Sequence, residues 1–441
     1  MPADALPRWR WVKARRLARW LELRSAPYIA ARLVALVRRY GATSAKSKRR
    51  IVGCITLLER YQCRPTFPTP GRVVHRDPEF FRKIQNWGAE LNVHGYDHID
   101  FLGLSREEAN RQFSKAVEAF DKAGIQFDGF RCPYLSYSRA LLDALPPSRF
   151  SYSSNQAILW NVLPGRQDST AVFDTLQEFY RPVPCEEAVS SPRLCGEVVE
   201  LPIGIPDDLQ MFDGLNMEPK EIGRAWSAVL HQTHRRGELF VLLFHPELLD
   251  DCQDALKAVL DAAITLQPRV WITTMREVAA WWREKAGFSA EVSEHGASLR
   301  IRFVCSERAT ILLRNVVTGA GVIPWDGATQ ALQSRELEVG AERRPFIGVA
   351  GGADAELVGF LREQGFILET GLAAPSCAIY LDANLLTALS NRRRLLDYIE
   401  NSQEPLARFG RWPYGAKSAL NITGDLDALS LVDYAARVFV R

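Results

Sequence analysis

Two histidines stand four residues apart in the segment His94-Gly95-Tyr96-Asp97-His98, directly after a predicted strand. Histidines at this spacing lie on one side of a helix or of a compact loop, so both imidazoles can reach one cation. In α/β folds, ligands bind at the carboxyl ends of the strands. The segment therefore indicates a metal site, although core packing explains many isolated pairs of this kind.

Two further segments place polar side chains at predicted strand ends. In Gly129-Phe130-Arg131-Cys132-Pro133-Tyr134, Arg131 is a permanent cation that can hold a carboxylate, and the proline fixes a turn. In Leu242-Leu243-Phe244-His245-Pro246, His245 follows an apolar strand and is well placed for acid–base chemistry. Each segment alone is equally compatible with a structural arginine in a tight turn or a buried structural histidine.

Taken together and in this order, the three segments resemble the polysaccharide deacetylase family, the carbohydrate esterases of family four. The resemblance covers roughly residues 46–285 and includes Ala89-Glu90-Leu91 and Leu135-Ser136-Tyr137, which flank the motifs. No single motif is specific to the family, but the combination of motifs in this order is.

The resemblance implies a role for each motif residue. His94 and His98 would be metal ligands, Arg131 would hold the catalytic base, and the backbone N–H of Tyr134 would meet the oxyanion together with the metal. His245 would be the general acid that protonates the departing amine. These roles come from the family pattern and not from the spacing.

One family motif is missing from its usual place. The family opens with a strand that ends in two aspartates, the base and the third metal ligand, but residues 23–64 contain no Asp. The pattern reappears at 419–427, where an apolar strand runs into Thr423-Gly424-Asp425-Leu426-Asp427. We therefore expect a circular permutation with the first barrel strand at 418–424, because domain termini often lie close together.

The order of the family motif makes Asp425 the general base and Asp427 the third metal ligand. The alternative is that both aspartates belong to an ordinary turn and helix N-cap. A second departure lies at Ser153, where relatives often have an aspartate that sets the charge of the acid histidine. Asp207 or Asp208 could replace it, or both could be loop residues.

The resemblance implies a hydrolase that removes N-acetyl, or similar N-acyl, groups from a sugar or glycan with metal-activated water. Two imidazoles and one carboxylate suit zinc, and they also accept cobalt, nickel or manganese. The expected partner is a carbohydrate or glycan precursor, and no nucleic acid is expected. Two alternatives stay open: a catalytically silent carbohydrate-binding or scaffold relative, and an amidohydrolase acting on a small non-sugar amide.

Strands and helices alternate from about residue 45 to 287, which indicates parallel strands wrapped by helices. The expected fold is α/β, a distorted (β/α)7-type barrel, circularly permuted, with an inserted smaller α+β segment. The predicted parts are a basic helical extension (1–44), the main barrel (45–287), a β-rich and βαβ insert of unknown role (288–410), and the strand and helix with the Asp motif (411–441).

The first 50 residues are strongly basic, with 14 Lys/Arg against 2 Asp/Glu. Trp9, Trp11 and Trp20 interleave with these cations, as in a helix at an anionic membrane surface, or in a solvated helix along the body.

No secretory signal or membrane-length apolar run is visible, and the eight cysteines show no paired spacing. These features favour a cytoplasmic protein or one peripheral to the membrane; the oligomeric state stays open.

Overall fold

The structure is a computed structural model that describes residues 36–37, 39–142, 145–146, 148–163, 171–389 and 391–438. The tryptophans proposed for membrane contact, Trp9, Trp11 and Trp20, lie outside the described residues. Among the described helices, none is long and apolar enough to cross a bilayer.

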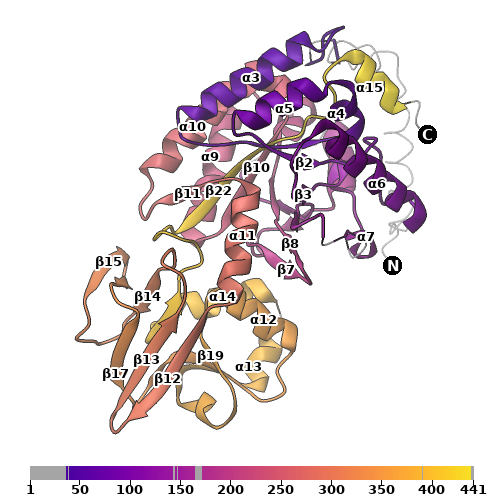
Figure 1. The fold of residues 1–441 in the computed structure, drawn as a ribbon. Coiled ribbons are helices and arrows are strands. Elements are labelled where there is room, and N and C mark those ends of the chain that lie inside the picture. Colours follow the sequence, from indigo (N-terminus) through magenta and orange to yellow (C-terminus); the bar gives the residue numbers. More distant parts are fainter. Residues whose placement is uncertain are drawn as a thin grey trace, which may run out of the picture.

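The α/β fold class is confirmed, with one large curled sheet at its centre (Figure 1). The sheet has twelve strands, in the order β6-β5-β9-β10-β22-β1-β2-β3-β4-β8-β7, with β11 also paired to β22. Its strands are β1 (Thr66–Thr69), β2 (Glu90–Val93), β3 (Gly129–Phe130), β4 (Tyr152–Ser153), β5 (Ala157–Leu159), β6 (Val183–Pro184), β7 (Arg193–Cys195), β8 (Val198–Glu200), β9 (Ile203–Ile205), β10 (Leu239–Phe244), β11 (Val270–Ile272) and β22 (Ser418–Gly424). The sheet therefore has more strands than a seven-stranded barrel, because short additional strands extend it at both ends.

The strand β22 comes from the far end of the described chain and lies in the middle of this sheet. It pairs in parallel with β10 over six residues, from Leu239↔Ala419 to Phe244↔Gly424, and it also pairs with β1 and β11. All seven of its residues are buried. In Figure 1 it is the yellow strand that runs up between β10 and β2, and it brings residues 425–427 to the carboxyl ends of the parallel strands.

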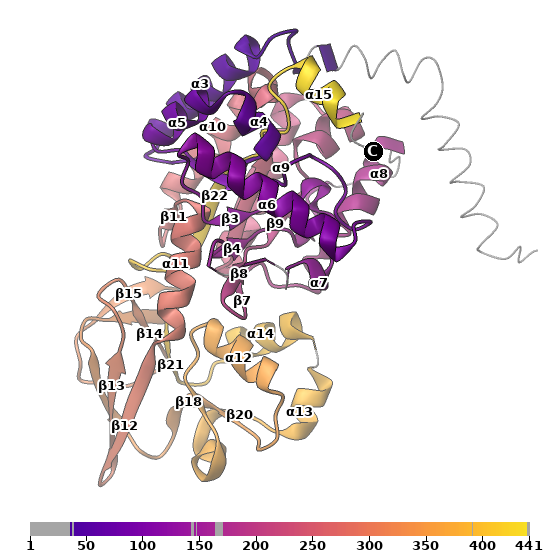
Figure 2. The ribbon, with the colours of Figure 1, turned by 45° about the vertical axis from the view of Figure 1, so that its right-hand side comes forward.

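Helices cover the outer face of the sheet, as Figures 1 and 2 show. The helices α9 and α10 pack against each other, and α9 also packs against β10. The helices of this part are α3 (Ala45–Glu59), α4 (Gly71–Arg76), α5 (Pro78–Asn86), α6 (Arg106–Ala123), α7 (Arg139–Leu142), α8 (Ala171–Tyr180), α9 (Pro219–Arg236), α10 (Leu249–Thr265), α11 (Met275–Ala286) and α15 (Leu431–Val438).

The start of α6 carries a complete capping box. The Ser105 hydroxyl accepts from the backbone N–H of Glu108, whose carboxylate accepts from the N–H of Ser105. This capping box satisfies donors that the first helical turn leaves without intrahelical partners. The helix ends at Gly124 in the left-handed region, where glycine lacks the steric penalty of a Cβ atom.

Residues 289–409 form three smaller sheets below the main one (Figure 1). In β13, Leu299, Ile301 and Phe303 are buried while Arg300 and Arg302 are exposed, which is the alternation typical of a strand with one face in the core. The strands are β12 (Ser289–His295), β13 (Ser298–Val304), β14 (Ile311–Arg314), β15 (Val322–Asp326), β16 (Thr329–Leu332), β17 (Glu336–Gly340), β18 (Arg344–Val349), β19 (Leu368–Glu369), β20 (Cys377–Leu381) and β21 (Leu406–Phe409).

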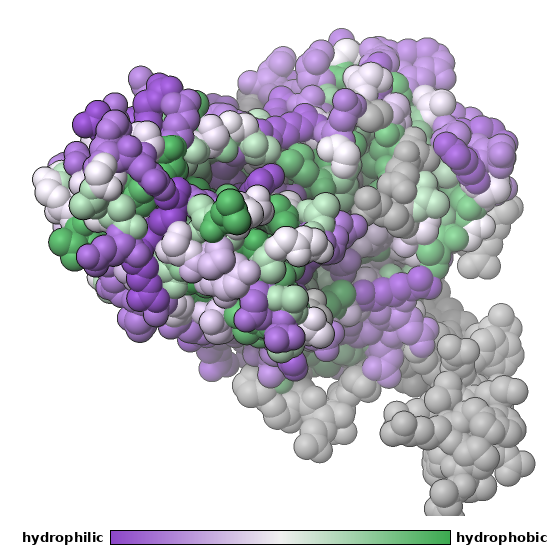
Figure 3. All heavy atoms as spheres, turned by 90° about the horizontal axis from the view of Figure 1, so that it is seen from below, coloured by the Kyte–Doolittle hydropathy of each residue, from purple (hydrophilic) through white to green (hydrophobic). Residues whose placement is uncertain are grey.

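The helices of this lower part are α12 (Ala355–Glu363), α13 (Ala383–Ala388) and α14 (Arg392–Asn401). The strand β21 pairs with β14 and is followed by a segment that leads directly into β22. Figure 3 views the molecule from this end, where hydrophilic and hydrophobic side chains are interspersed. The lower part therefore lies between β11 and β22 in the chain, although these strands are neighbours in the main sheet.

Candidate metal centre

The loop that carries both histidines begins where β2 ends, at Val93. Gly95 has a φ of +71°, and a Cβ atom there would lie 3.0 Å from the Phe101 ring, so glycine allows the sharp turn. The Asp97 carboxylate pairs with Arg72 at 2.5 Å, and its backbone N–H donates to the Gln112 side chain. These contacts hold the loop in a compact form that returns His98 to the side of His94.

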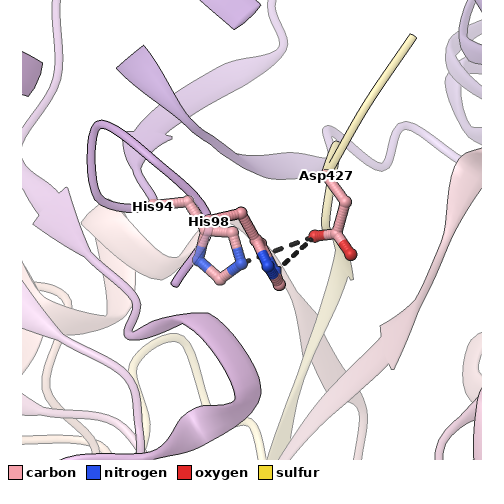
Figure 4. A group of neighbouring side chains, drawn as sticks. All are labelled: His94, His98 and Asp427. Atoms are coloured by element: carbon pink, nitrogen blue, oxygen red, sulfur yellow. Dashed lines mark ion pairs between the residues drawn. The ribbon is translucent and has the colours of Figure 1, made fainter. Parts of the chain in front are cut away.

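The two imidazoles converge on Asp427, which comes from the segment after β22 (Figure 4). His98 Nε2 lies 3.1 Å from Asp427 Oδ1, and His94 Nε2 lies 3.5 Å from the same oxygen. One ligand atom from each of the three residues lies within 4.8 Å of the others, and all three side chains are buried. The three residues therefore form a group with the donor types and the spacing of a metal site.

The hydrogen bonds of His94 show which of its ring nitrogens is available to coordinate a cation. Its Nδ1 lies 2.9 Å from the backbone carbonyl oxygen of Arg131, which can only accept, so Nδ1 carries the proton in the neutral imidazole. The buried Nε2 has no hydrogen-bond partner among the described residues. A neutral His94 thus presents a lone pair toward the Asp427 carboxylate, which favours a cation between them.

The predicted partner of Arg131 is also present. The Arg131 guanidinium is fully buried and donates from Nη1 to Asp425 Oδ1 at 2.7 Å and to Thr423 Oγ1 at 3.0 Å. Its Nη2 donates to Ser154 Oγ at 3.2 Å. Because the guanidinium is fixed on several sides, it holds the Asp425 carboxylate beside His94, with Oδ2 at 3.7 Å from His94 Nε2.

His245 faces the same group from the end of β10. Its Nε2 lies 4.0 Å from Asp427 Oδ2, and its Nδ1 lies 2.8 Å from Asp208 Oδ1. Asp208 Oδ2 also accepts the backbone N–H of His245 at 2.7 Å. Burial by itself lowers the pKa of His245, but the charge and the hydrogen bond of Asp208, together with the charge of Asp427, raise the pKa to about 10.

Of the two candidate replacements for the missing aspartate, Asp208 is the one that contacts His245. Ser153 instead donates to Glu200, whose carboxylate also accepts from the backbone N–H groups of Asn155 and Gln156. Asp207 accepts from the Tyr180 hydroxyl at 2.7 Å and from the Gln210 N–H at 2.8 Å. Burial and the neighbouring Asp208 raise the pKa of Asp207 to about 7.

An aromatic pair lies beside the metal-site group, and sequence reasoning missed half of it. Tyr134 has a φ of +57°, and its ring centroid lies 4.6 Å from that of His98. The Phe179 ring from α8 stacks on Tyr134 with centroids 5.0 Å apart and an angle of 26°. Phe179 is partly exposed and belongs to no recognised motif, so only its place in the folded chain reveals it.

The site residues lie within and beyond a recognisable family segment. Residues 48–147 match the family model of polysaccharide deacetylase. The resemblance read from the sequence is confirmed over these residues. The matched segment contains His94, His98 and Arg131, while His245 and both aspartates lie outside it.

A curated relative is the uncharacterized protein YlxY from Bacillus subtilis (strain 168), which is 24% identical over 109 residues. The match covers 24% of this chain, and the chain spans about a third (33%) of the length of that relative. A structure from Mycobacterium smegmatis that is assigned to the polysaccharide deacetylases is 23% identical, with a TM-score of 0.44, over 59% of this chain and 85% of that one. A family-four pseudoenzyme from Bacillus anthracis is 18% identical, with a TM-score of 0.24, over 36% and 51%.

Proposed function

We propose that the protein is a metal-dependent hydrolase that removes N-acetyl, or similar N-acyl, groups from a sugar or glycan. The observation that carries the proposal is the convergence of Asp427 on His94 and His98, which lie more than 300 positions earlier in the chain. A role in a turn or as a helix N-cap does not explain why the Asp427 carboxylate lies next to two buried imidazoles. Zinc fits two imidazoles and one carboxylate, and cobalt, nickel or manganese are the alternatives.

A divalent cation held by these three residues would polarise the amide carbonyl and make water acidic enough to attack it. Asp425 is the proposed base, because Arg131 fixes one carboxylate oxygen and leaves the other directed toward His94. His245 is the proposed acid: Asp208 holds Nδ1, so Nε2 is the atom that can give a proton to the leaving nitrogen. The backbone N–H of Tyr134 is proposed as an oxyanion donor.

We further propose that the chain is a circular permutation of the family fold. The support is the position of β22, which is parallel to both β1 and β10 and lies between them. A strand there places the Thr423-to-Asp427 segment where the missing motif would lie in an unpermuted chain. The smaller sheets of residues 289–409 then occupy the connection from β11 to β22.

Metal content and acetate release test the proposed function together. We expect the purified protein to carry about one divalent cation, and Asp427→Ala to lose most of it. The matched variant Asp425→Asn should keep the metal, because Asp425 is the base and not a ligand in the proposal. With N-acetylated sugar oligomers, Asp425→Asn and His245→Ala should each release acetate about 100-fold more slowly or worse.

The outcomes separate the alternatives. Equal metal content in the unchanged protein and in Asp427→Ala would remove Asp427 as a ligand and with it the proposal. A protein that binds metal through Asp427 but releases no acetate from sugar oligomers is a silent relative or acts on another amide. A small N-acyl amide tested in parallel distinguishes those two results.

A further inference from the structure

A polar cavity lies far from the candidate metal centre, where the lower part of the molecule meets the main sheet. Its volume is about 410 Å³, within the range of about 300–1,000 Å³ that is typical of small-molecule sites. It is lined by the end of α9, by β14, β15 and α14, and by the residues just before β22. Seven parallel-strand residues separate its edge at Lys417 from Gly424, which is on the order of 20 Å.

The cavity has a surplus of positive charge. Seven Arg and Lys side chains line it, against three Asp and Glu side chains. Each acid already has a basic partner: Asp326 pairs with Lys417, Asp397 with Arg393, and Glu400 with both Arg408 and Arg411. Arg393 also pairs with the buried Glu238, which lies outside the cavity lining. Three net positive charges therefore remain without a carboxylate among the described residues.

Some of the guanidinium nitrogens are buried and have no hydrogen-bond partner within the part of the chain that the structure describes. These are Nη2 of Arg314, Nε of Arg408 and Nε of Arg411. Arg411 is only 3% exposed, and burial lowers its pKa to about 10, with the charge of Arg408 acting in the same direction. Crowded, desolvated cations are costly unless an anion neutralises them.

We propose that this cavity binds a phosphorylated small ligand, through a phosphate or diphosphate group. Guanidinium groups match phosphate oxygens in charge and geometry, and a diphosphate carries two to three negative charges at neutral pH. Trp325 adds an aromatic wall, and its Nε1 is held by the carbonyl of Gly415 at 2.9 Å. A ligand in the cavity contacts both parts of the molecule and stabilises their packing.

Isothermal titration of the full chain with inorganic phosphate, inorganic pyrophosphate and uridine diphosphate tests the proposal. We expect saturable binding of pyrophosphate at one site, tighter than that of phosphate. If uridine diphosphate binds more tightly than pyrophosphate, the cavity recognises a nucleoside diphosphate. Equal binding identifies the diphosphate group alone.

Two cavity variants and one control locate the site. Arg408→Gln and the exposed Arg235→Gln should each weaken pyrophosphate binding about tenfold. Arg394→Gln, which is exposed on the same helix α14 but outside the cavity, should bind as the unchanged protein does. Arg235→Gln leaves the core intact and keeps the test valid if Arg408→Gln folds poorly. Absent binding, or binding that neither cavity variant weakens, overturns the proposal.

Discussion

Replacing Asp207 by Asn should stabilise the protein, and the gain should grow as the pH rises. Asp207 is fully buried next to Asp208, and together these effects raise its pKa from 3.8 to about 7. A carboxylate with a raised pKa is protonated in the folded protein at pH values where the unfolded chain has already lost the proton. The folded state therefore loses stability as the pH rises from about 4 to about 7, and the loss is complete above 7.

The magnitude follows from the shift. About three pKa units correspond to about 4 kcal/mol of unfolding free energy above pH 7. At pH 5, only about a third of the pH range between the two pKa values has been crossed, so the cost is roughly 1–2 kcal/mol. Asparagine keeps both partners: its oxygen can accept from the Gln210 N–H, and its amide can donate to the Tyr180 hydroxyl, which reverses the direction of that one hydrogen bond.

Guanidinium unfolding at pH 5 and pH 8 measures the effect. We expect Asp207→Asn to be more stable than the unchanged protein at both pH values, with the difference larger by about 2 kcal/mol at pH 8. Asp254→Asn, an exposed change on α10, is the control and should show no pH-dependent difference. An equal gain for Asp207→Asn at both pH values would refute the assignment of a raised pKa to Asp207.

Three other changes test separate parts of the structure. Ser105→Ala removes the capping box of α6 and should lower the unfolding free energy by about 1 kcal/mol in chemical denaturation, whereas Ser105→Asp should largely preserve it. Gly95→Ala strains the left-handed turn against the Phe101 ring and should weaken metal binding in a competition titration; unchanged affinity would show that the loop is not fixed by this turn. Phe179→Ala should raise KM for sugar oligomers several-fold with kcat nearly unchanged, and a loss confined to kcat would argue against a stacking role.

Parts of the site were predictable from the sequence because their information is local. The spacing of His94 and His98 after a strand already indicated that both imidazoles could reach one cation. The structure places both Nε2 atoms near one carboxylate. The pairing of Arg131 with Asp425 followed from the order of the family motifs, although 294 positions separate the two residues. Their roles in catalysis remain predictions.

Other parts depend on long-range packing that no local pattern encodes. Nothing in Ile205-Pro206-Asp207-Asp208 distinguishes the carboxylate that bonds His245 from the one that bonds Tyr180. The strands β4 to β9 contain only two or three residues each, too few to show an alternating pattern. Phe179 became visible as a neighbour of Tyr134 only once α8 had been placed.

The position of β22 also governs when the protein can finish folding during its synthesis. The ribosome must make residues up to Gly424 before the gap between β1 and β10 can be filled, so the nascent chain exposes two unpaired strand edges until then. A message that ends prematurely anywhere before this strand yields a product without its central strand and without Asp425 and Asp427. Chaperones and proteases that recognise exposed strand edges would remove such products, so assembly of the proposed site requires completed translation of this strand.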